Sequence, residues 1–188
     1  MEITRPTKIP SPEYVLEVAL SERHAAETRR LLESCGNEFV PPLSMRTSTH
    51  QTDLRGLEGT GTRPGEYFSE LSHQPFVLAL SGGRVVAFLS FIEGYPVMRG
   101  EERHMTTYVT TICVDPAYRH RGIAAELYRF LERHSSSRYF STRTWSTNVV
   151  QTTLLQSIGY HELARIQDDR GRGIDTVYYL KELPESTW

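Results

Sequence analysis

The segment from Val114 to Glu132, VDPAYRHRGIAAELYRFLE, constrains the fold more than any other part of the chain. It follows an apolar run rich in β-branched residues, passes a proline, and continues with apolar residues spaced for one buried helix face. The pattern therefore predicts a strand, a tight turn and a helix. The turn carries Arg119, His120, Arg121 and Gly122, so three basic side chains and a glycine lie where the helix begins.

Such a helix start is suited to binding a phosphate group. The first turn of a helix has N–H groups without intrahelical partners, and the aligned peptide dipoles add partial positive charge there. Gly122 lacks a Cβ that would block close approach, small Ala124 and Ala125 keep the surface open, and Arg119 and Arg121 can add charge-assisted contacts. Two interpretations follow from the local sequence: a pyrophosphate site, or a solvated helix start with an ordinary turn glycine.

The rest of the chain predicts an α/β (α+β) fold. We expect an N-terminal lead over residues 1–12 and one domain over residues 13–188, because this length suits a single core. A mixed, largely antiparallel sheet of about seven strands should carry helices on its faces. Strands are expected at 13–20, 75–95 (a hairpin), 105–115, within 135–145, and at 160–166 and 175–183; helices are expected at 21–36, 65–73, 122–134 and 148–159.

Two polar connections are candidates for a substrate-binding surface. Residues 37–65 are broken by prolines and glycines and are too long for an idle loop, so we expect a mobile substrate-facing segment or a partly helical one. Residues 96–104 form the second connection. By analogy with other folds of this kind, both would build the variable part of the site.

Composition excludes several classes of function. A net charge of -2 at pH 7 gives no general attraction to nucleic acid or to an anionic membrane. The two cysteines lack C-x-x-C spacing, so neither a disulfide framework nor a zinc site is indicated. No apolar run is long enough to span a bilayer, and the first residues do not read as a signal peptide. We expect a cytoplasmic protein without a metal.

Two motifs in order resemble those of one superfamily. Arg119-x-x-Gly122-x-Ala124, between a strand and an amphipathic helix, resembles the acyl-CoA-binding motif of the GNAT superfamily of N-acetyltransferases, Arg/Gln-x-x-Gly-x-Gly/Ala. The approach V-D-P-x-Y-R is typical of bacterial members. The helix that begins at Asn148 and ends in Gly159-Tyr160 is similar to the family's second signature. Together the motifs and the element order cover roughly residues 13–182.

The resemblance implies the GNAT fold and acetyl-CoA as acyl donor. In that fold the sheet splays at the acyl-CoA-binding strand, whose free backbone groups bind the pantetheine arm. Here Ile112 and Val114 would supply those groups, and the Ile112 N–H would polarise the thioester carbonyl. Asn148 would lie near the cofactor or serve only as a helix cap. The implied cofactor-binding residues are Ile112, Cys113, Val114, Arg119, His120, Arg121, Gly122, Ile123, Ala124, Ala125 and Asn148.

The chain departs from the family at the positions that move protons. The family's tyrosine, seven residues after the asparagine, often protonates the departing thiolate; here that position is Leu155, which cannot donate a proton. Four residues before Ile112, where some members carry a glutamate base, this chain has Tyr108, a poor base at its ordinary pKa. Tyr108 could instead be the proton donor. The candidates for catalysis are Tyr108, His104 and Glu93, with Glu70 as a further carboxylate.

Three hypotheses about function follow. The first is an N-acetyltransferase that moves an acetyl group directly to a primary amine, on a small molecule or a peptide, within a ternary complex. The second is an acyl-CoA-binding sensor or interaction domain that has lost the chemistry, which Leu155 favours. A nucleotide hydrolase is disfavoured, because no Gly-Lys-Ser/Thr follows the turn. The C-terminal strands could pair across a homodimer.

Overall fold

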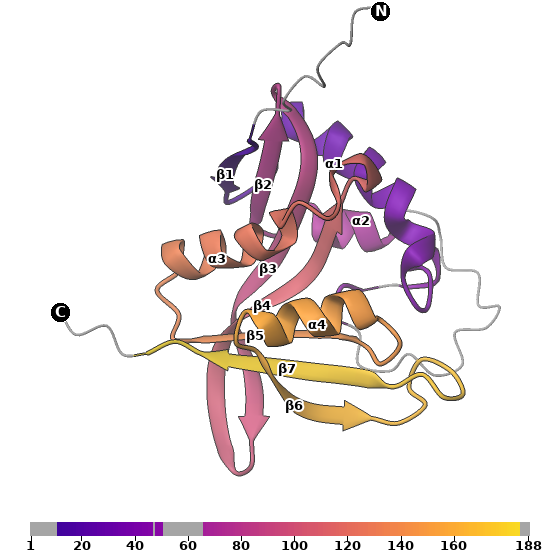
Figure 1. Ribbon diagram of the computed structural model, residues 1–188, viewed down its shortest axis with the longest axis vertical. Helices are drawn as coiled ribbons and strands as arrows, with labels where there is room; N and C mark the ends of the chain where they lie inside the picture. Colours follow the sequence, from indigo (N-terminus) through magenta and orange to yellow (C-terminus); the bar gives the residue numbers. More distant parts are fainter. Residues whose placement is uncertain (1–10, 47, 51–65, 185–188) are drawn as a thin grey trace, which may run out of the picture.

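A seven-stranded mixed sheet forms the centre of the protein, with strand order β1-β2-β3-β4-β5-β7-β6 (Figure 1). The computed structural model describes residues 11–46, 48–50 and 66–184. β4 and β5 run parallel, and the other neighbouring pairs run antiparallel. The strands are β1 Glu13–Glu17, β2 Phe76–Ser81, β3 Arg84–Arg99, β4 Glu102–Val114, β5 Tyr139–Trp145, β6 His161–Ile166 and β7 Thr176–Glu182. The predicted mixed, largely antiparallel sheet is confirmed.

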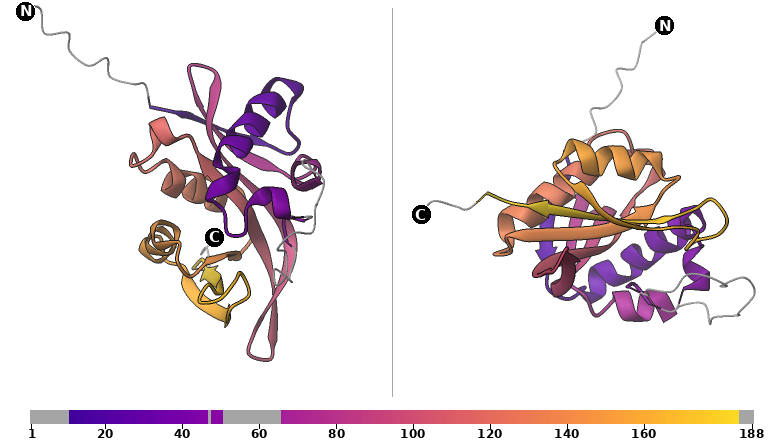
Figure 2. Two further views of the ribbon diagram at one scale, coloured as in Figure 1. Left: turned by 90° about the vertical axis from the view of Figure 1, so that its right-hand side faces the viewer. Right: turned by 90° about the horizontal axis from the view of Figure 1, so that it is seen from below.

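Helices cover both faces of this sheet, as Figures 1 and 2 show. The helices are α1 Glu22–Cys35, α2 Glu66–Leu71, α3 Ile123–His134 and α4 Val149–Ser157, with short 3-10 turns at Gly36–Glu38, Leu43–Met45 and Pro116–Tyr118. One core lies beneath α3 and α4 and includes the fully buried Leu127 and Phe140; a second lies beneath α1 and α2 and includes Leu71 and Phe88. Each large apolar side chain buried in this way stabilises the fold by about 1.5–3 kcal/mol.

The sheet splays between β4 and β5. Their ladder is short, running from Thr107 opposite Phe140 to Val109 opposite Thr142. Beyond it, β4 continues along β3 and β5 continues along β7, so the two strands separate. The far half of β4 therefore has one edge without a neighbouring strand, as the family resemblance implied.

The connection expected at residues 96–104 is a β-hairpin, so that prediction was wrong. β3 and β4 stay paired from Tyr95 opposite Thr106 to Arg99 opposite Glu102, and Gly100 makes the turn at a φ of 63°. Pro96 fits within β3 because β2 pairs with β3 only as far as Phe76 opposite Ser90. The proline thus lies on an open edge, where its missing N–H costs no ladder bond.

The ends of α1 differ from the sequence expectation in detail. Ser21 stands at the N-cap, but its side chain makes no capping bond and instead donates to Glu17. Gly36 has a right-handed φ of -59°, so the chain continues into a 3-10 turn rather than reversing. Of the connection over residues 37–65, the described part holds two short 3-10 turns, and the remainder lies outside the described residues.

Candidate active site

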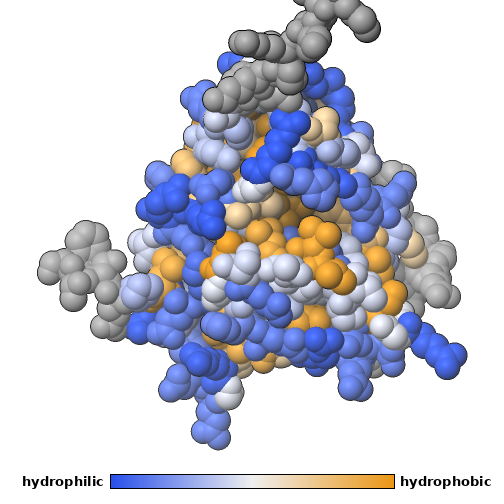
Figure 3. All heavy atoms as spheres, viewed as in Figure 1, coloured by the Kyte–Doolittle hydropathy of each residue, from blue (hydrophilic) through white to orange (hydrophobic). Residues whose placement is uncertain are grey.

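A cavity of about 510 Å³ opens where β4 and β5 separate. In the space-filling view the surface between α3 and α4 is recessed and rich in hydrophobic side chains (Figure 3). Of the residues predicted to bind the cofactor, all except Arg121 line this cavity. The structure thus brings together the strand Ile112–Val114, the turn before α3 and Asn148, and their cofactor-binding role stays a prediction. The lining also includes Cys35, Glu38, Phe39, Thr110, Thr111, Arg143, Trp145, Gln151 and Leu154.

The turn before α3 offers a concave set of backbone donors. His120 and Gly122 both have left-handed backbone conformations, with φ values of 60° and 77°. Successive N–H groups in such turns converge on one point and bind anions. The first intrahelical bond runs from the Glu126 N–H to the Gly122 carbonyl, so the N–H groups of Ile123, Ala124 and Ala125 precede it.

Gly122 is required by its backbone conformation and not by internal packing. A Cβ added there would meet no heavy atom within 4 Å. The space in front of the glycine is therefore open to a ligand, while its φ of 77° is one that other residues adopt only with strain.

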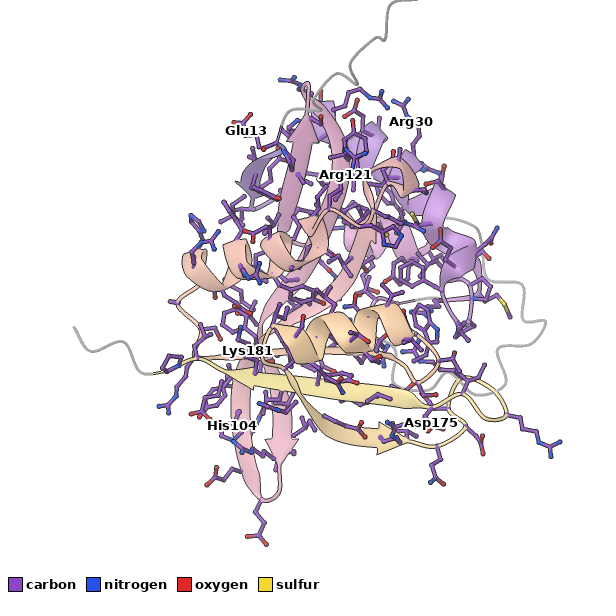
Figure 4. The ribbon with its side chains drawn as sticks, in the orientation of Figure 1. Glu13, Arg30, His104, Arg121, Asp175 and Lys181 are labelled. Atoms are coloured by element: carbon purple, nitrogen blue, oxygen red, sulfur yellow. The ribbon has the colours of Figure 1, made fainter. Side chains whose placement is uncertain are left out.

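The side chains of Arg119 and Arg121 already form hydrogen bonds within the protein. The Nη2 of Arg121 donates to the Ala117 carbonyl at 2.8 Å, and its guanidinium lies 5.1 Å from the centre of the Tyr118 ring (Figure 4). Arg119 donates from Nε to the Val114 carbonyl at 3.0 Å and from Nη2 to Glu38 at 2.8 Å. The hydrogen bond to Glu38 raises the pKa of Arg119. Arg119 thus ties the end of β4 to the turn after α1.

Backbone groups of β4 face the cavity in the expected register. The Asp115 N–H donates to Val86 on β3 at 2.9 Å, so it points away from the cavity. Backbone groups alternate along a strand, and those of Val114 and Ile112 therefore point to the free edge. The Val114 carbonyl accepts a hydrogen bond from Arg119 Nε, which agrees with its pointing to the free edge.

The two cysteines, distant in sequence, meet beside the cavity. Cys35 and Cys113 are both buried and both free thiols. A hydrogen bond from Cys113 lowers the pKa of Cys35 to about 6, helped by the Arg119 guanidinium, while burial raises the pKa of Cys113 well above its usual value. The sequence spacing gave no sign of this contact.

The three residues predicted to be catalytic are not brought together. Tyr108 is buried and stacked on Tyr95 with ring centres 4.3 Å apart, and burial raises its pKa well above the usual value. His104 lies on the β3–β4 hairpin, remote from Arg121 in Figure 4, and Glu93 lines a separate cavity of about 410 Å³. None of the three lines the cavity between β4 and β5, so their catalytic role remains untested.

Leu155 occupies the core and not the cavity. It is fully buried in the cluster beneath α3 and α4, and the cavity is lined instead by Leu154 and Gln151 from the same helix. Asn148 caps α4 by accepting from the Gln151 N–H at 3.2 Å, and its side-chain amide donates to Thr144.

Sequence reasoning missed a chain of polar side chains that leads away from the cavity. Thr110, which lines the cavity, donates to Gln74 at 2.6 Å, and Gln74 donates to Thr49 at 2.7 Å. Thr49 donates to Glu70 at 2.6 Å, and Glu70 lies 3.0 Å from the Nδ1 of His50. Burial raises the pKa of Glu70, but hydrogen bonds from Thr49 outweigh it and the pKa is lowered. No motif spacing connects these residues.

Sequence reasoning also missed a meeting of three arginines from separate segments at the cavity: Arg46 and Arg170, which are buried, and Arg143, which is half-buried. Arg143 itself lines the cavity.

Within the described residues, no group of three or more His, Cys, Asp or Glu side chains is arranged to hold a metal ion. Among the described helices, none is long and apolar enough to cross a membrane.

Solved structures share this fold. An acetyltransferase of the GNAT family from Streptococcus agalactiae matches with a TM-score of 0.64 at 14% identity, over 95% of this chain and 100% of that one. An N-acetyltransferase from Staphylococcus aureus matches with a TM-score of 0.63 at 13% identity, over 92% and 99%. A Bacillus anthracis protein assigned as a streptothricin acetyltransferase, in complex with acetyl coenzyme A, matches with a TM-score of 0.50 at 14% identity, over 59% of this chain and 63% of that one.

No curated protein sequence matches the chain significantly. Residues 42–164, however, match the sequence pattern of the acetyltransferase (GNAT) family. This match spans both motifs, the splayed strands and most of the cavity lining. The chain therefore belongs to the GNAT acetyltransferase family.

Proposed function

We propose that the protein is an N-acetyltransferase that moves an acetyl group directly from acetyl-CoA to a primary amine. The observation that carries this proposal is one continuous cavity, which runs from the backbone donors before α3 to the gap between β4 and β5. The family and the acetyl coenzyme A bound to the related Bacillus anthracis structure support the choice of acyl donor. A cytoplasmic location, a bacterial source and homodimerisation stay predictions.

Different parts of the cavity would bind different parts of acetyl-CoA. The turn around Gly122 would hold the pyrophosphate through backbone N–H groups, because such donors bind anions without a side chain. The free edge of β4 at Ile112 and Val114 would hold the pantetheine arm as a neighbouring strand would. An aimed backbone donor near the thioester would stabilise the charge that develops on its oxygen.

Proton transfer needs groups other than the family's tyrosine. His50, paired with Glu70, is a candidate base, because a carboxylate beside an imidazole orients the ring and stabilises the imidazolium that forms when it accepts a proton. Tyr67 is a candidate donor to the departing thiolate, since its hydroxyl lies 2.6 Å from Thr111, which lines the cavity. Tyr67 itself does not line the cavity, so its proton would pass through the Thr111 hydroxyl; burial raises the pKa of Tyr67, so its phenol is protonated at neutral pH.

Two measurements test this function. Calorimetry with acetyl-CoA reports binding, and thiol release across a panel of amines reports transfer. Amine-dependent release of CoA is expected. Binding without turnover for every amine would favour the sensor hypothesis, and absence of binding would contradict both.

A histidine substitution tests the candidate base. His50→Gln should lower kcat by about 10²-fold and remove the acidic limb of the kcat–pH profile, as loss of a general base does. His161→Gln, at an exposed position on β6, is the control and should leave the profile unchanged. An unaltered pH profile in His50→Gln would exclude His50 as the base.

A further inference from the structure

Three arginines converge on one face of the sheet from three parts of the chain; we call Arg46, Arg143 and Arg170 the arginine cluster. Arg46 follows the second 3-10 turn, Arg143 lies on β5, and Arg170 lies in the turn between β6 and β7. Arg46 and Arg170 are only 6% and 7% exposed. The guanidinium groups lie close enough for the charge of Arg46 to act on Arg170 and for that of Arg143 to act on both.

Among the described residues, the cluster has more positive charge than the neighbouring carboxylates compensate. Within the described part of the chain, none of the three arginines forms an ion pair with a carboxylate. The nearest acid acting on Arg170 is Asp169, which is joined to it through the Thr176 hydroxyl. Three cations and one carboxylate leave two positive charges. The other titratable groups acting on the cluster are the phenols of Tyr67, Tyr95, Tyr108 and Tyr178.

Burying uncompensated charge is unfavourable, and Arg46 and Arg170 show its effect. Burial, followed by repulsion from Arg143, lowers the pKa of Arg46 to about 10. Burial, followed by repulsion from Arg46 and Arg143, lowers the pKa of Arg170 to about 9. At Arg143, burial also lowers the pKa, but interactions with Tyr108 and Tyr178 outweigh it and the pKa is raised. Buried charges in proteins are normally paired, so a cluster of this kind indicates an anion that the protein binds.

Part of the cluster has a structural role that does not explain the rest. The Val40 carbonyl accepts from Arg46 at 2.9 Å and from Arg170 at 2.6 Å, and Arg46 also donates to the Pro41 carbonyl. These bonds fix the chain between the two 3-10 turns. Neutral carbonyls accept hydrogen bonds from the guanidinium groups but do not neutralise their positive charge. Arg143 makes none of these bonds to Val40 or Pro41.

Arg143 has the donors and the position to bind a ligand. Its Nη1 donates to the Tyr178 hydroxyl at 3.2 Å, whereas a guanidinium carries five N–H donors in a planar fork. It follows Thr142, the last residue of β5 that pairs with β4, and it lines the cavity. A group held by Arg143 would therefore lie beside the point where the two strands separate.

The remaining two arginines stand directly behind the cavity wall. The Cζ of Arg46 lies 5.6 Å from the ring centre of Phe39, and the Cζ of Arg170 lies 5.7 Å from that of Trp145. Both aromatic rings line the cavity, with their centres 5.8 Å apart. This part of the cavity is thus apolar on its surface and electropositive behind it.

We propose that the arginine cluster binds a carboxylate of the acceptor, which is therefore a small amine bearing at least one carboxylate group. The inference rests on the proposed transferase function and deepens it. Arg143 contacts the carboxylate through its fork, which matches the planar, two-oxygen geometry of that group. Arg46 and Arg170 maintain the positive potential. The carboxylate, once held, places the amine toward the gap in which the thioester would lie.

Matched substrates test the proposal. The twenty common amino acids are compared with their carboxamides, which keep the side chain and the amine and lose only the carboxylate charge. We expect kcat/KM to be about 10- to 100-fold higher for the acid than for the amide of the preferred side chain, as a hydrogen-bonded charge warrants. The amine of the amide is less basic, so a larger fraction of it is unprotonated at neutral pH; a preference for the acid would therefore not reflect amine protonation.

Substitutions of Arg143 test whether the arginine cluster causes the preference for acids over amides. Arg143→Gln should raise KM for the acid about 10- to 100-fold while changing KM for the amide little. Arg143→Lys, which keeps the charge but loses the fork, should lie between wild type and Gln. Arg165→Gln is the control and should behave as wild type, because Arg165 on β6 is paired with Glu162 on the same strand and with Asp175 just before β7.

The outcomes separate this inference from the proposed function. Amides turned over as well as acids, with the same KM in wild type and Arg143→Gln, would overturn the acceptor assignment and leave the transferase intact. Absence of turnover with every amine would overturn both. A carboxylate preference that Arg143→Gln abolishes would support both. If that variant does not fold, the Arg143→Lys comparison decides.

Discussion

The turn before α3 and the arginine cluster both present positive charge to one cavity, but they are built differently. The turn uses backbone N–H groups of consecutive residues, and its two arginines are engaged with Glu38, Val114 and Ala117. The cluster uses three side chains from separate segments of the chain, and the carboxylates of the described residues do not match their charge. A short motif can specify the first kind of site, whereas only the folded sheet assembles the second.

The largest expected effect is at Gly122. Gly122→Glu should weaken acetyl-CoA binding at least about 100-fold, because a carboxylate would occupy the open space before the donors and repel phosphate. Gly100→Glu is a matched control: Gly100 also has a positive φ, 63°, and also has no atom within 4 Å of an added Cβ. Both variants carry similar backbone strain. Equal affinities of the two variants in calorimetry would show that the turn does not bind the cofactor.

A smaller effect is expected at Arg119, and it should exceed that at Arg121. Arg119→Ala removes the bonds to Val114 and Glu38 that hold the end of β4, so we expect about a 10-fold loss of acetyl-CoA affinity. Arg121→Ala should cost only about 2- to 3-fold, because that side chain is exposed and tethered to its own turn. The reverse order in a titration would mean that side-chain charge, not backbone, dominates this end of the cavity.

The smallest effect concerns stability and depends on pH. Citrate should raise Tm of the wild type by about 2–5 °C at pH 7 relative to sodium chloride of equal ionic strength, since a ligand of the native state stabilises it. Arg170 and Arg46 lose their charge as the pH rises through about 9 and about 10. The pKa of Arg143, despite burial, is raised by Tyr108 and Tyr178, so the gain should shrink above pH 10 without vanishing. Differential scanning fluorimetry at pH 7 and above pH 10 measures it.

Arg143→Gln should lose most of the citrate effect at pH 7, and Arg165→Gln should retain it. A citrate effect that is the same in all variants, or that persists unchanged above pH 10, would show that the anion binds elsewhere.

The end of the cavity at the turn before α3 was predictable because its residues are local in sequence. Each feature can be inferred from a few neighbouring residues. Gly122 indicates a left-handed backbone conformation, Asn148 a helix cap, and the apolar spacing of α3 a buried helix face. The hairpin at residues 96–104 was missed because its charged residues suggest a loop, and its strand character depends on pairing with the opposite arm. Tyr108 and Leu155 illustrate another limit, since position relative to a motif gave no information about burial.

The sequence by itself determined the order of strands and helices, the glycine turn before α3 and the family, because periodicity, caps and turn residues act over a few positions. Tertiary structure alone decided that Cys35 meets Cys113, that His50 meets Glu70, and that three arginines share one face of the sheet. These contacts join residues far apart in the chain, and no local pattern encodes them. Burial then changes their chemistry, because removing a group from water shifts its pKa and makes an unpaired charge expensive.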